Sequence, residues 1–226
     1  MITTADLQGH WRRDWIRAPD FEDTTTRVHW LQAGALFADL RVPADLPALQ
    51  EGCLADLDAA TLQSLLRAEG FAGEITVARG QCTWHRAINW QGAVARPDVG
   101  AMWFDGDVLI EDGVHADYRE AWLAEPPTAP LRGHRIAWGD MTGVLVESDD
   151  RFLLGIGLAP IDRHVRDTFI SFYALGTWDG VQGIAELATD PFAMGKPVLD
   201  RANDSFVWHA PLFTGGTESR PLMKVR

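Results

Sequence analysis

Residues 26–42, TRVHWLQAGALFADLRV, contain two short runs of alternating apolar and polar residues separated by Ala33-Gly34. Alternation with a period of two is typical of a β-strand with one buried face, and a glycine between two such runs indicates a hairpin. With a two-residue turn at Ala33-Gly34, Trp30 would lie opposite Phe37, and Asp39 and Arg41 would continue the same face. This stretch therefore predicts an antiparallel hairpin with one aromatic and charged face.

The same pattern recurs along the chain between turn residues such as Asp105-Gly106 and Asp179-Gly180. The segments predicted to be strands are 10–17, 26–31, 35–42, 74–80, 82–90, 99–104, 107–111, 117–123, 134–139, 142–148, 151–158, 168–175, 181–188 and 205–210. One helix is predicted over 58–69, with Asp58 as its N-cap and Gly70 as its stop. So many strands with one short helix predict an all-β protein of antiparallel barrels, since closure removes exposed edges.

The segment AEPPTAPL, residues 124–131, holds three prolines and is predicted to join two halves. We expect a first β-barrel half over residues 1–124 and a second over 132–226. Residues 26–42 also align without gaps on residues 142–158, which suggests that the two halves are related.

The formal net charge is −12, and no run of basic residues exceeds Arg12-Arg13. Phosphate backbones need a clustered basic surface, so we expect no nucleic-acid partner. The N-terminus lacks the pattern of a signal peptide, and the longest apolar stretch, 152–161, is too short for a membrane span. Two cysteines, Cys53 and Cys82, are too few for a disulfide scaffold. These features favour a cytoplasmic protein without a membrane span.

Tryptophan is unusually frequent, with ten residues, as many as phenylalanine. Residues two apart on a strand share a face, and this places tryptophan beside arginine on several strands. The shared faces are Trp11, Arg13 and Trp15; Trp84, Arg86, Ile88 and Trp90; and Trp30 with Asp39 and Arg41. Tyr118, Glu120 and Trp122 form a related aromatic and acidic row.

Two interpretations of these rows remain open. The rows could line a barrel interior as a ligand site, or they could cover the outer surface with arginine stems lying along the rings. In the first interpretation the walls would be Trp30, Phe37, Trp84, Tyr118 and Trp122. Arg41 and Arg86 would hold an acidic group, with Asp39 orienting Arg41.

Other candidate chemistry is less specific. Cys82 and His85 are three apart on a predicted strand and so point to opposite faces, and we expect no metal site and no cofactor. The acidic group Asp105, Asp107, Glu111 and Asp112 is interpreted as a solvated hairpin.

Two short motifs carry a resemblance to a known family. Gly9-His10-Trp11 matches the G-x-W signature of lipocalins, and Tyr118-Arg119-Glu120-Ala121-Trp122 is similar to an F-R-E-L-W stretch. With the two-halved layout, the chain resembles the lipocalin-like (calycin) proteins with two tandem barrels, such as a fungal family of kinase-interacting proteins. The resemblance implies an eight-stranded barrel closed at one end by Trp11, with an arginine packed over it, and an apolar ligand cavity.

The leading expectation is a lipocalin-like protein that binds a small, mainly apolar ligand bearing an acidic group. One alternative is an enzyme in the same cavity, with His85 or Glu120 as general acid or base. Another is a protein-interaction module with filled barrels and exposed tryptophans. The sequence leaves open a homo-oligomer.

Overall fold

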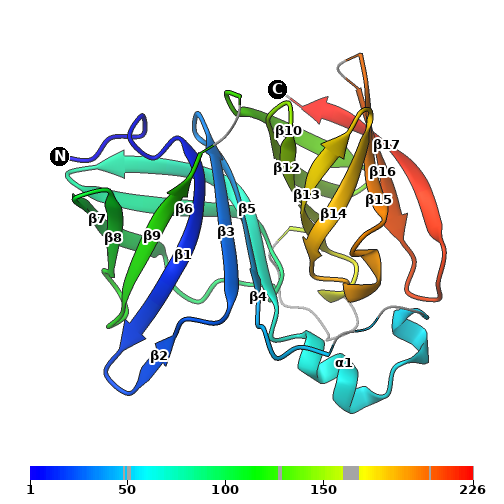
Figure 1. The fold of residues 1–226 in the computed structure, drawn as a ribbon, viewed down its shortest axis with the longest axis horizontal. Coiled ribbons are helices and arrows are strands. Elements are labelled where there is room, and N and C mark those ends of the chain that lie inside the picture. The colour runs from blue at the N-terminus through cyan, green and yellow to red at the C-terminus, as the bar shows by residue number, and fades with distance from the viewer. Residues whose placement is uncertain (48, 50–51, 127–128, 160–167, 204, 226) are drawn as a thin grey trace.

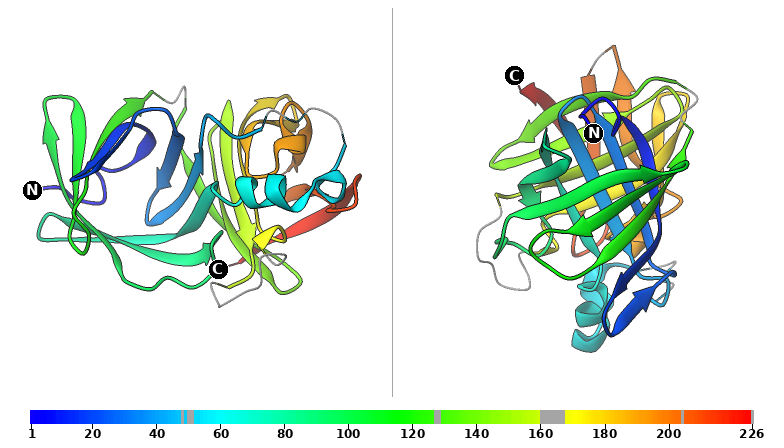
Figure 2. Two further views of the ribbon diagram at one scale, coloured as in Figure 1. Left: turned by 90° about the horizontal axis from the view of Figure 1, so that it is seen from below. Right: turned by 90° about the vertical axis from the view of Figure 1, so that its left-hand side faces the viewer.

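The computed structural model describes residues 1–47, 49, 52–126, 129–159, 168–203 and 205–225. These residues form two closed antiparallel β-barrels that lie side by side, with one short α-helix below them in Figure 1. The view from below in Figure 2 looks into both barrels. The predicted all-β class is therefore confirmed, and the barrels number two.

The first barrel closes because β1 pairs with both β3 and β9. The short strand β2 extends the far end of β1 outside the ring of eight. The strands of this barrel are β1 (Gly9–Ala18), β2 (Phe21–Asp23), β3 (Arg27–Ala33), β4 (Leu36–Val42), β5 (Glu69–Ala78), β6 (Gln81–Asn89), β7 (Asp98–Asp105), β8 (Val108–Gly113) and β9 (Arg119–Glu125).

The second barrel has the simpler up-and-down order and closes between β10 and β17. Its strands are β10 (Arg132–Trp138), β11 (Met141–Glu147), β12 (Arg151–Gly157), β13 (Phe172–Asp179), β14 (Gln182–Ala188), β15 (Pro197–Ala202), β16 (Ser205–Pro211) and β17 (Thr217–Val225). Its interior is filled by a continuous apolar cluster that includes Phe152, Phe172, Phe206 and Trp208.

The sequence pattern missed β2, β15 and β17. Most of β17 is exposed on both faces and contains Pro221, so its residues do not alternate between apolar and polar. In β15, Pro197 opens the strand and only Val198 and Leu199 are buried. Strands with so little buried surface leave no periodic signal.

The helix α1 (Ala59–Leu65) begins where predicted, since the Asp58 side chain accepts a hydrogen bond from the Thr61 amide at 2.7 Å. It ends earlier than predicted, and Gly70 belongs to β5 instead of stopping the helix. Two single-turn 3-10 helices, η1 (Leu54–Asp56) and η2 (Pro191–Ala193), complete the described helical structure. None of the described helices is long and apolar enough to cross a lipid bilayer.

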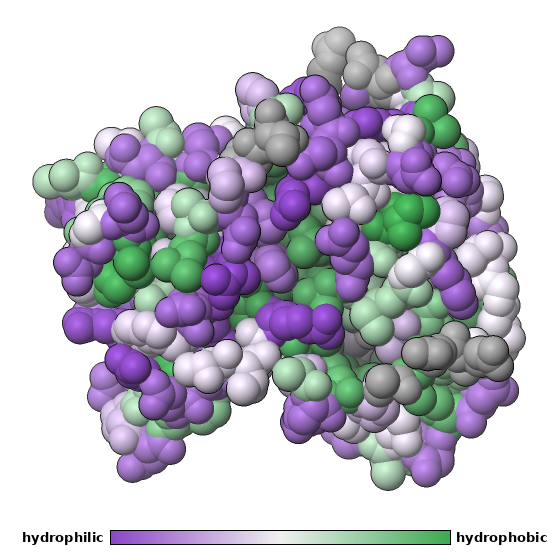
Figure 3. All heavy atoms as spheres, in the orientation of Figure 1, coloured by the Kyte–Doolittle hydropathy of each residue, from purple (hydrophilic) through white to green (hydrophobic). Residues whose placement is uncertain are grey.

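The two barrels pack through a shared apolar cluster, here called the inter-barrel core. It joins the outer faces of β3 to β6 to those of β11 to β14. Its fully or nearly fully buried members are Leu31, Ala33, Ala38, Leu40, Val42, Ala72, Ile88, Trp90, Val144, Val146, Leu153, Tyr173, Leu175 and Leu187. In Figure 3, hydrophobic side chains are visible in the depression between the barrels, framed by hydrophilic ones. Burial of this face makes the two barrels one packed unit.

The alignment of residues 26–42 on 142–158 does not match equivalent faces. The hairpins β3–β4 and β11–β12 do occupy the same place in their barrels. However, Leu40 points outward into the inter-barrel core, whereas Ile156, its aligned counterpart, points into the second barrel. A shift of one residue reverses every side chain of a strand, so the gapless alignment is out of register.

A histidine pair lies at the edge of the contact between the barrels. Arg151 of the second barrel donates from Nη1 to His10 Nδ1 at 2.9 Å, and His10 Nε2 lies 2.9 Å from His29 Nδ1. His10 must then carry its proton on Nε2 and donate it to His29, so both rings are neutral. Burial lowers the pKa of His10 to about 3 and that of His29 to about 4, and Arg151 and Arg12 add to both effects.

Replacing Gly70 with Ala should destabilise the contact between the barrels. An added Cβ would meet the ring of Tyr173, which is fully buried in the inter-barrel core. We expect the free energy of unfolding to fall by about 1–3 kcal/mol, measured by urea denaturation. In a Tyr173→Ala background the same substitution should cost much less, and equal costs in both backgrounds would show that the ring is not the cause.

The neutral histidine pair should make stability depend on pH. The unfolded chain protonates His10 near pH 6.5 and the folded protein only near pH 3, so the unfolded state binds more protons between these values. The free energy of unfolding should therefore fall by about 2 kcal/mol for His10 alone from pH 7 to pH 5, with His29 adding to the loss. Urea denaturation at both pH values should show a smaller loss in His10→Gln, while His85→Gln keeps the wild-type dependence. An unchanged pH dependence in His10→Gln would contradict this account.

Candidate functional site

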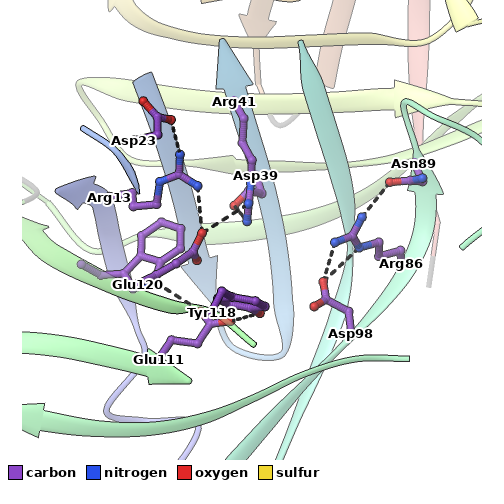
Figure 4. A network of polar contacts seen from close by, with 11 residues as sticks. Arg13, Asp23, Asp39, Arg41, Arg86, Asn89, Asp98, Glu111, Tyr118 and Glu120 are labelled. Atoms are coloured by element: carbon purple, nitrogen blue, oxygen red, sulfur yellow. Dashed lines mark hydrogen bonds and ion pairs between the residues drawn. The ribbon is translucent and has the colours of Figure 1, made fainter. Parts of the chain in front are cut away.

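One end of the first barrel contains a cavity of about 170 Å³, here called the inner cavity. Its lining residues are Ile16, Trp30, Asp39, Arg41, Phe71, Trp84, Arg86, Asp98, Glu111, Tyr118, Glu120 and Trp122. They come from the middle of β3, from the later parts of β1, β4, β6 and β8, and from the early parts of β5, β7 and β9, with Tyr118 directly before β9. Antiparallel strands bring these parts to the same end of the barrel. Figure 4 shows the polar residues converging there from several strands.

The other end of the first barrel is closed by apolar packing. Ile2 and Leu7 of the N-terminal segment pack with Trp11, whose indole Nε1 donates to the Leu7 carbonyl at 2.8 Å. The rings next to Trp11 are Trp30 and Phe104, with centroids 6.2 and 6.1 Å away. Trp11 thus lies in the core at one barrel end, and these aromatic rings are its neighbours.

Most of the predicted site residues meet at the inner cavity. Eight of the ten line it, namely Trp30, Asp39, Arg41, Trp84, Arg86, Tyr118, Glu120 and Trp122, and Phe37 and His85 do not. Phe37 is fully buried deeper in the barrel, with its ring 6.0 Å from that of Phe71. His85 is exposed on the outer wall, where its Nε2 lies 2.9 Å from Thr76 Oγ1.

The turn of the first hairpin lies one residue later in the chain than the predicted turn at Ala33-Gly34. The turn residues are Gly34 and Ala35, so Trp30 lies opposite Asp39, and Phe37 lies opposite Gln32. Gly34 has a φ of 61°, which only glycine adopts readily, and it therefore occupies the first turn position. The predicted face is preserved, because the pairing shifts by two residues.

Two β-bulges change which tryptophans point inward. In β6, Arg86 pairs with Gly73 and Ile88 pairs with Ala72, so Ala87 has no partner. Beyond the bulge, Ile88 and Trp90 turn outward into the inter-barrel core, contrary to the single face predicted from alternation.

In β1, the register shifts between Arg13 and Trp15. Arg13 points into the barrel, whereas Trp15 lines an outer groove. The predicted row of Trp11, Arg13 and Trp15 is therefore divided between two faces.

Arg13 is the most deeply buried cation of the site. Its Nη1 lies 2.8 Å from Glu120 Oε1, and its Nη2 lies 3.0 Å from Asp23 Oδ2. The side chains of Arg13 and Glu120 are only 6% and 2% exposed. Through these contacts, Arg13 of β1 connects to Glu120 of the neighbouring strand β9 and to Asp23 of β2 (Figure 4).

Arg41 and Arg86 are also paired within the protein. Arg41 Nε lies 2.9 Å from Asp39 Oδ1, and its Nη1 lies 3.6 Å from Glu120 Oε1. Arg86 Nη2 lies 2.6 Å from Asp98 Oδ2. Both guanidinium groups also lie near the Phe71 ring, at 5.0 and 3.5 Å from its centroid.

Glu111 is a buried carboxyl group, although its acidic neighbours in the sequence predict a solvated hairpin. Asp105 and Asp107 are exposed as predicted, but Glu111 is 3% exposed and lines the inner cavity. Its Oε1 accepts a hydrogen bond from the Tyr118 hydroxyl at 2.8 Å, and its Oε2 accepts one from Trp122 Nε1 at 3.2 Å. The burial of Glu111 could have been predicted from its spacing of two residues from Leu109 on β8, because residues two apart on a strand share a face and Leu109 is apolar.

Two of the cavity carboxyl groups, Asp39 and Glu111, have a raised pKa. Burial raises the pKa of Asp39 to about 6, although Arg41 opposes the shift. Burial and the nearby Glu120 carboxylate hold the pKa of Glu111 well above its ordinary value. Gly100 lies beside Glu111, and a Cβ there would overlap its side chain, so this glycine provides the space that the carboxyl group occupies.

The outer wall of the first barrel carries a larger, open groove of about 740 Å³, here called the outer groove. Arginines lie over tryptophan rings there, with Arg17 4.2 Å from the Trp15 centroid and Arg119 5.3 Å from the Trp103 centroid. Some residues of the tryptophan and arginine rows therefore line the barrel interior, and others cover its outer wall. Tyr118 lines the outer groove as well as the inner cavity, so it stands between them.

Comparisons with known proteins give a likeness of fold. No family model matches the chain, and no curated protein matches its sequence. Among solved structures, it is similar to the uncharacterized protein YLR301w from Saccharomyces cerevisiae, with a TM-score of 0.53 and 9% identity. The similarity covers 96% of this chain and 98% of that chain, so it extends over both barrels.

Removing the buried Arg13 should destabilise the protein far more than removing an exposed arginine of the same strand. Arg13→Met leaves Glu120 and Asp23 without this cation, and we expect a loss of about 3 kcal/mol in urea denaturation. Arg17→Met is the matched control, since Arg17 and Glu22 are 57% and 53% exposed, and it should cost less than about 1 kcal/mol. Adding Glu120→Gln to Arg13→Met should recover part of the loss. Equal costs for the two arginines would refute the importance of the buried pair.

Proposed function

We propose that the protein binds a small molecule in the inner cavity of the first barrel. The observation that carries this proposal is the contrast between the two barrels. The second barrel has an apolar interior, and the pocket of about 170 Å³ at its end is lined mainly by apolar residues, among them Phe172 and Trp208. The first barrel instead keeps a cavity of about 170 Å³ among aromatic and paired charged residues. A dry cavity of about 150 Å³ is known to admit benzene, so the inner cavity suits a ligand of about the size of one ring.

The walls support a ligand with an apolar frame. Trp30 lies between Trp84 and Trp122, with ring centroids 5.7 and 5.8 Å away in edge-to-face arrangements. These rings present a rigid aromatic surface, while the charged groups around them can fix the orientation of a polar substituent. The acidic group expected from the sequence is not part of this proposal, because Arg41 and Arg86 already bind Asp39 and Asp98.

An enzyme acting on a small molecule in the same cavity is the second candidate. The observation that favours it is Glu111, whose raised pKa keeps a proton available at the cavity wall. Glu111 is a better candidate for the general acid or base than the two residues expected from the sequence. His85 lies outside the barrel, and Glu120 is paired with Arg13. Recovery of a bound ligand unchanged after long incubation would favour the binding protein over the enzyme.

The burial of the tryptophans gives less support to an interaction module. Six are buried, three are half-buried, and Trp103 is exposed. Membership of the lipocalin-like family stays a prediction, supported by the position of Trp11 at the end of an eight-stranded barrel. A cytoplasmic location is likewise proposed, since Cys53 and Cys82 are both free thiols.

Binding in the inner cavity should be visible at individual indole groups. Titration with benzyl alcohol, followed by NMR of the indole N–H signals, should shift the signals of Trp30, Trp84 and Trp122. Trp138 and Trp178 of the second barrel serve as internal controls and should not move. Shifts confined to the second barrel, or none at millimolar concentration, would refute the proposed site.

A further inference from the structure

The charges around the inner cavity do not balance. Three guanidinium groups, Arg13, Arg41 and Arg86, face five carboxyl groups, Asp23, Asp39, Asp98, Glu111 and Glu120. Each guanidinium has a carboxylate oxygen within 3.0 Å, so the positive charges are already neutralised. The surplus at this end of the barrel is negative.

Glu111 is the carboxyl group that lacks a cation. Its two hydrogen-bond donors, Tyr118 and Trp122, are neutral groups. Among the described residues, no Lys, Arg or His nitrogen lies within 4.0 Å of its carboxyl oxygens. Burying a carboxylate without a counter-charge is costly, so this position favours a positive charge from outside the protein.

The aromatic walls are suited to the same kind of ligand. The electron-rich faces of indole rings attract cations, and this attraction strengthens where water is excluded. Trp30, Trp84 and Trp122 line the cavity together with Glu111, and Trp122 contacts Glu111 directly. An anionic ligand would have to displace Asp39 or Asp98 from its arginine and would remain beside the other carboxylates.

We propose that the inner cavity binds a compact organic cation, an ammonium group on a small apolar frame, whose charge lies against the Glu111 carboxylate and whose frame contacts the tryptophan rings. This inference rests on the proposed function and names the ligand class of the same site. It differs from the acidic ligand expected from the sequence in the sign of the charge.

Proton release should accompany binding. In the empty cavity, burial and Glu120 hold the pKa of Glu111 well above its ordinary value, so Glu111 carries a proton. An ammonium group beside it stabilises the carboxylate, and the proton leaves to the buffer. The charge of the cavity is then unchanged overall, since one proton is exchanged for one cation. Affinity should rise about tenfold per pH unit while Glu111 is protonated in the free protein.

The test uses three probes of similar size that differ in charge: benzylammonium, benzyl alcohol and benzoate. At neutral pH, benzylammonium should bind about tenfold more tightly than benzyl alcohol, and benzoate should bind most weakly. Isothermal titration of benzylammonium in phosphate and in Tris buffer should differ in heat by the release of about one proton per site. Benzyl alcohol should show no such difference.

Variants assign the effect to one carboxyl group. Glu111→Gln should weaken benzylammonium binding at least about tenfold and weaken benzyl alcohol binding by a much smaller factor. Glu186→Gln, the same exchange at an exposed glutamate of the second barrel, should change neither. If Glu111→Gln does not fold, the buffer dependence of the benzylammonium heat in the wild-type protein tests the inference. Release of about one proton per site supports it, and no release overturns it.

The outcomes separate this inference from the proposed function. Binding of benzyl alcohol or benzoate as tight as that of benzylammonium, with the same indole shifts, would overturn the cation and retain the binding site. Failure of all three probes to shift the indole signals of Trp30, Trp84 and Trp122 would overturn both.

Discussion

A charged group removed from water must meet an opposite charge, and the interior of the first barrel is organised by this requirement. Arg13 meets it by joining Glu120 and Asp23, which ties three strands together at one end of the barrel. The inner cavity lies among these paired ionic groups and the aromatic rings next to them. The second barrel has the same number of strands in its ring, but its interior is apolar.

Much of this arrangement follows from periodicity alone. Alternation in 26–42 is sufficient to place Trp30, Asp39 and Arg41 on one face, and alternation in 118–122 places Tyr118, Glu120 and Trp122 together. The side chains of a barrel strand point either inward or outward. Residues that share a face therefore all point into the barrel or all point out of it. The number of strands then makes closure the natural outcome, as observed for both halves.

The sequence could not reveal features that depend on one extra residue or on neighbours far along the chain. The bulge at Ala87 leaves no mark in composition, yet it sends Trp90 to the opposite face from Trp84. Glu111 was interpreted as solvated because it follows acidic residues in a hairpin. Its burial arises from Trp122 on the next strand and from Tyr118, which directly precedes that strand. Both contacts depend on the pairing of β8 with β9.

The position of Tyr118 links the interior of the first barrel to its exterior. One side chain lines both the inner cavity and the outer groove, and its hydroxyl is held by Glu111. A rotation of this ring would therefore change the shape of the inner cavity and of the outer groove together. The inner cavity and the outer groove thus share one side chain as part of their walls, and this side chain joins the interior of the first barrel to its outer surface.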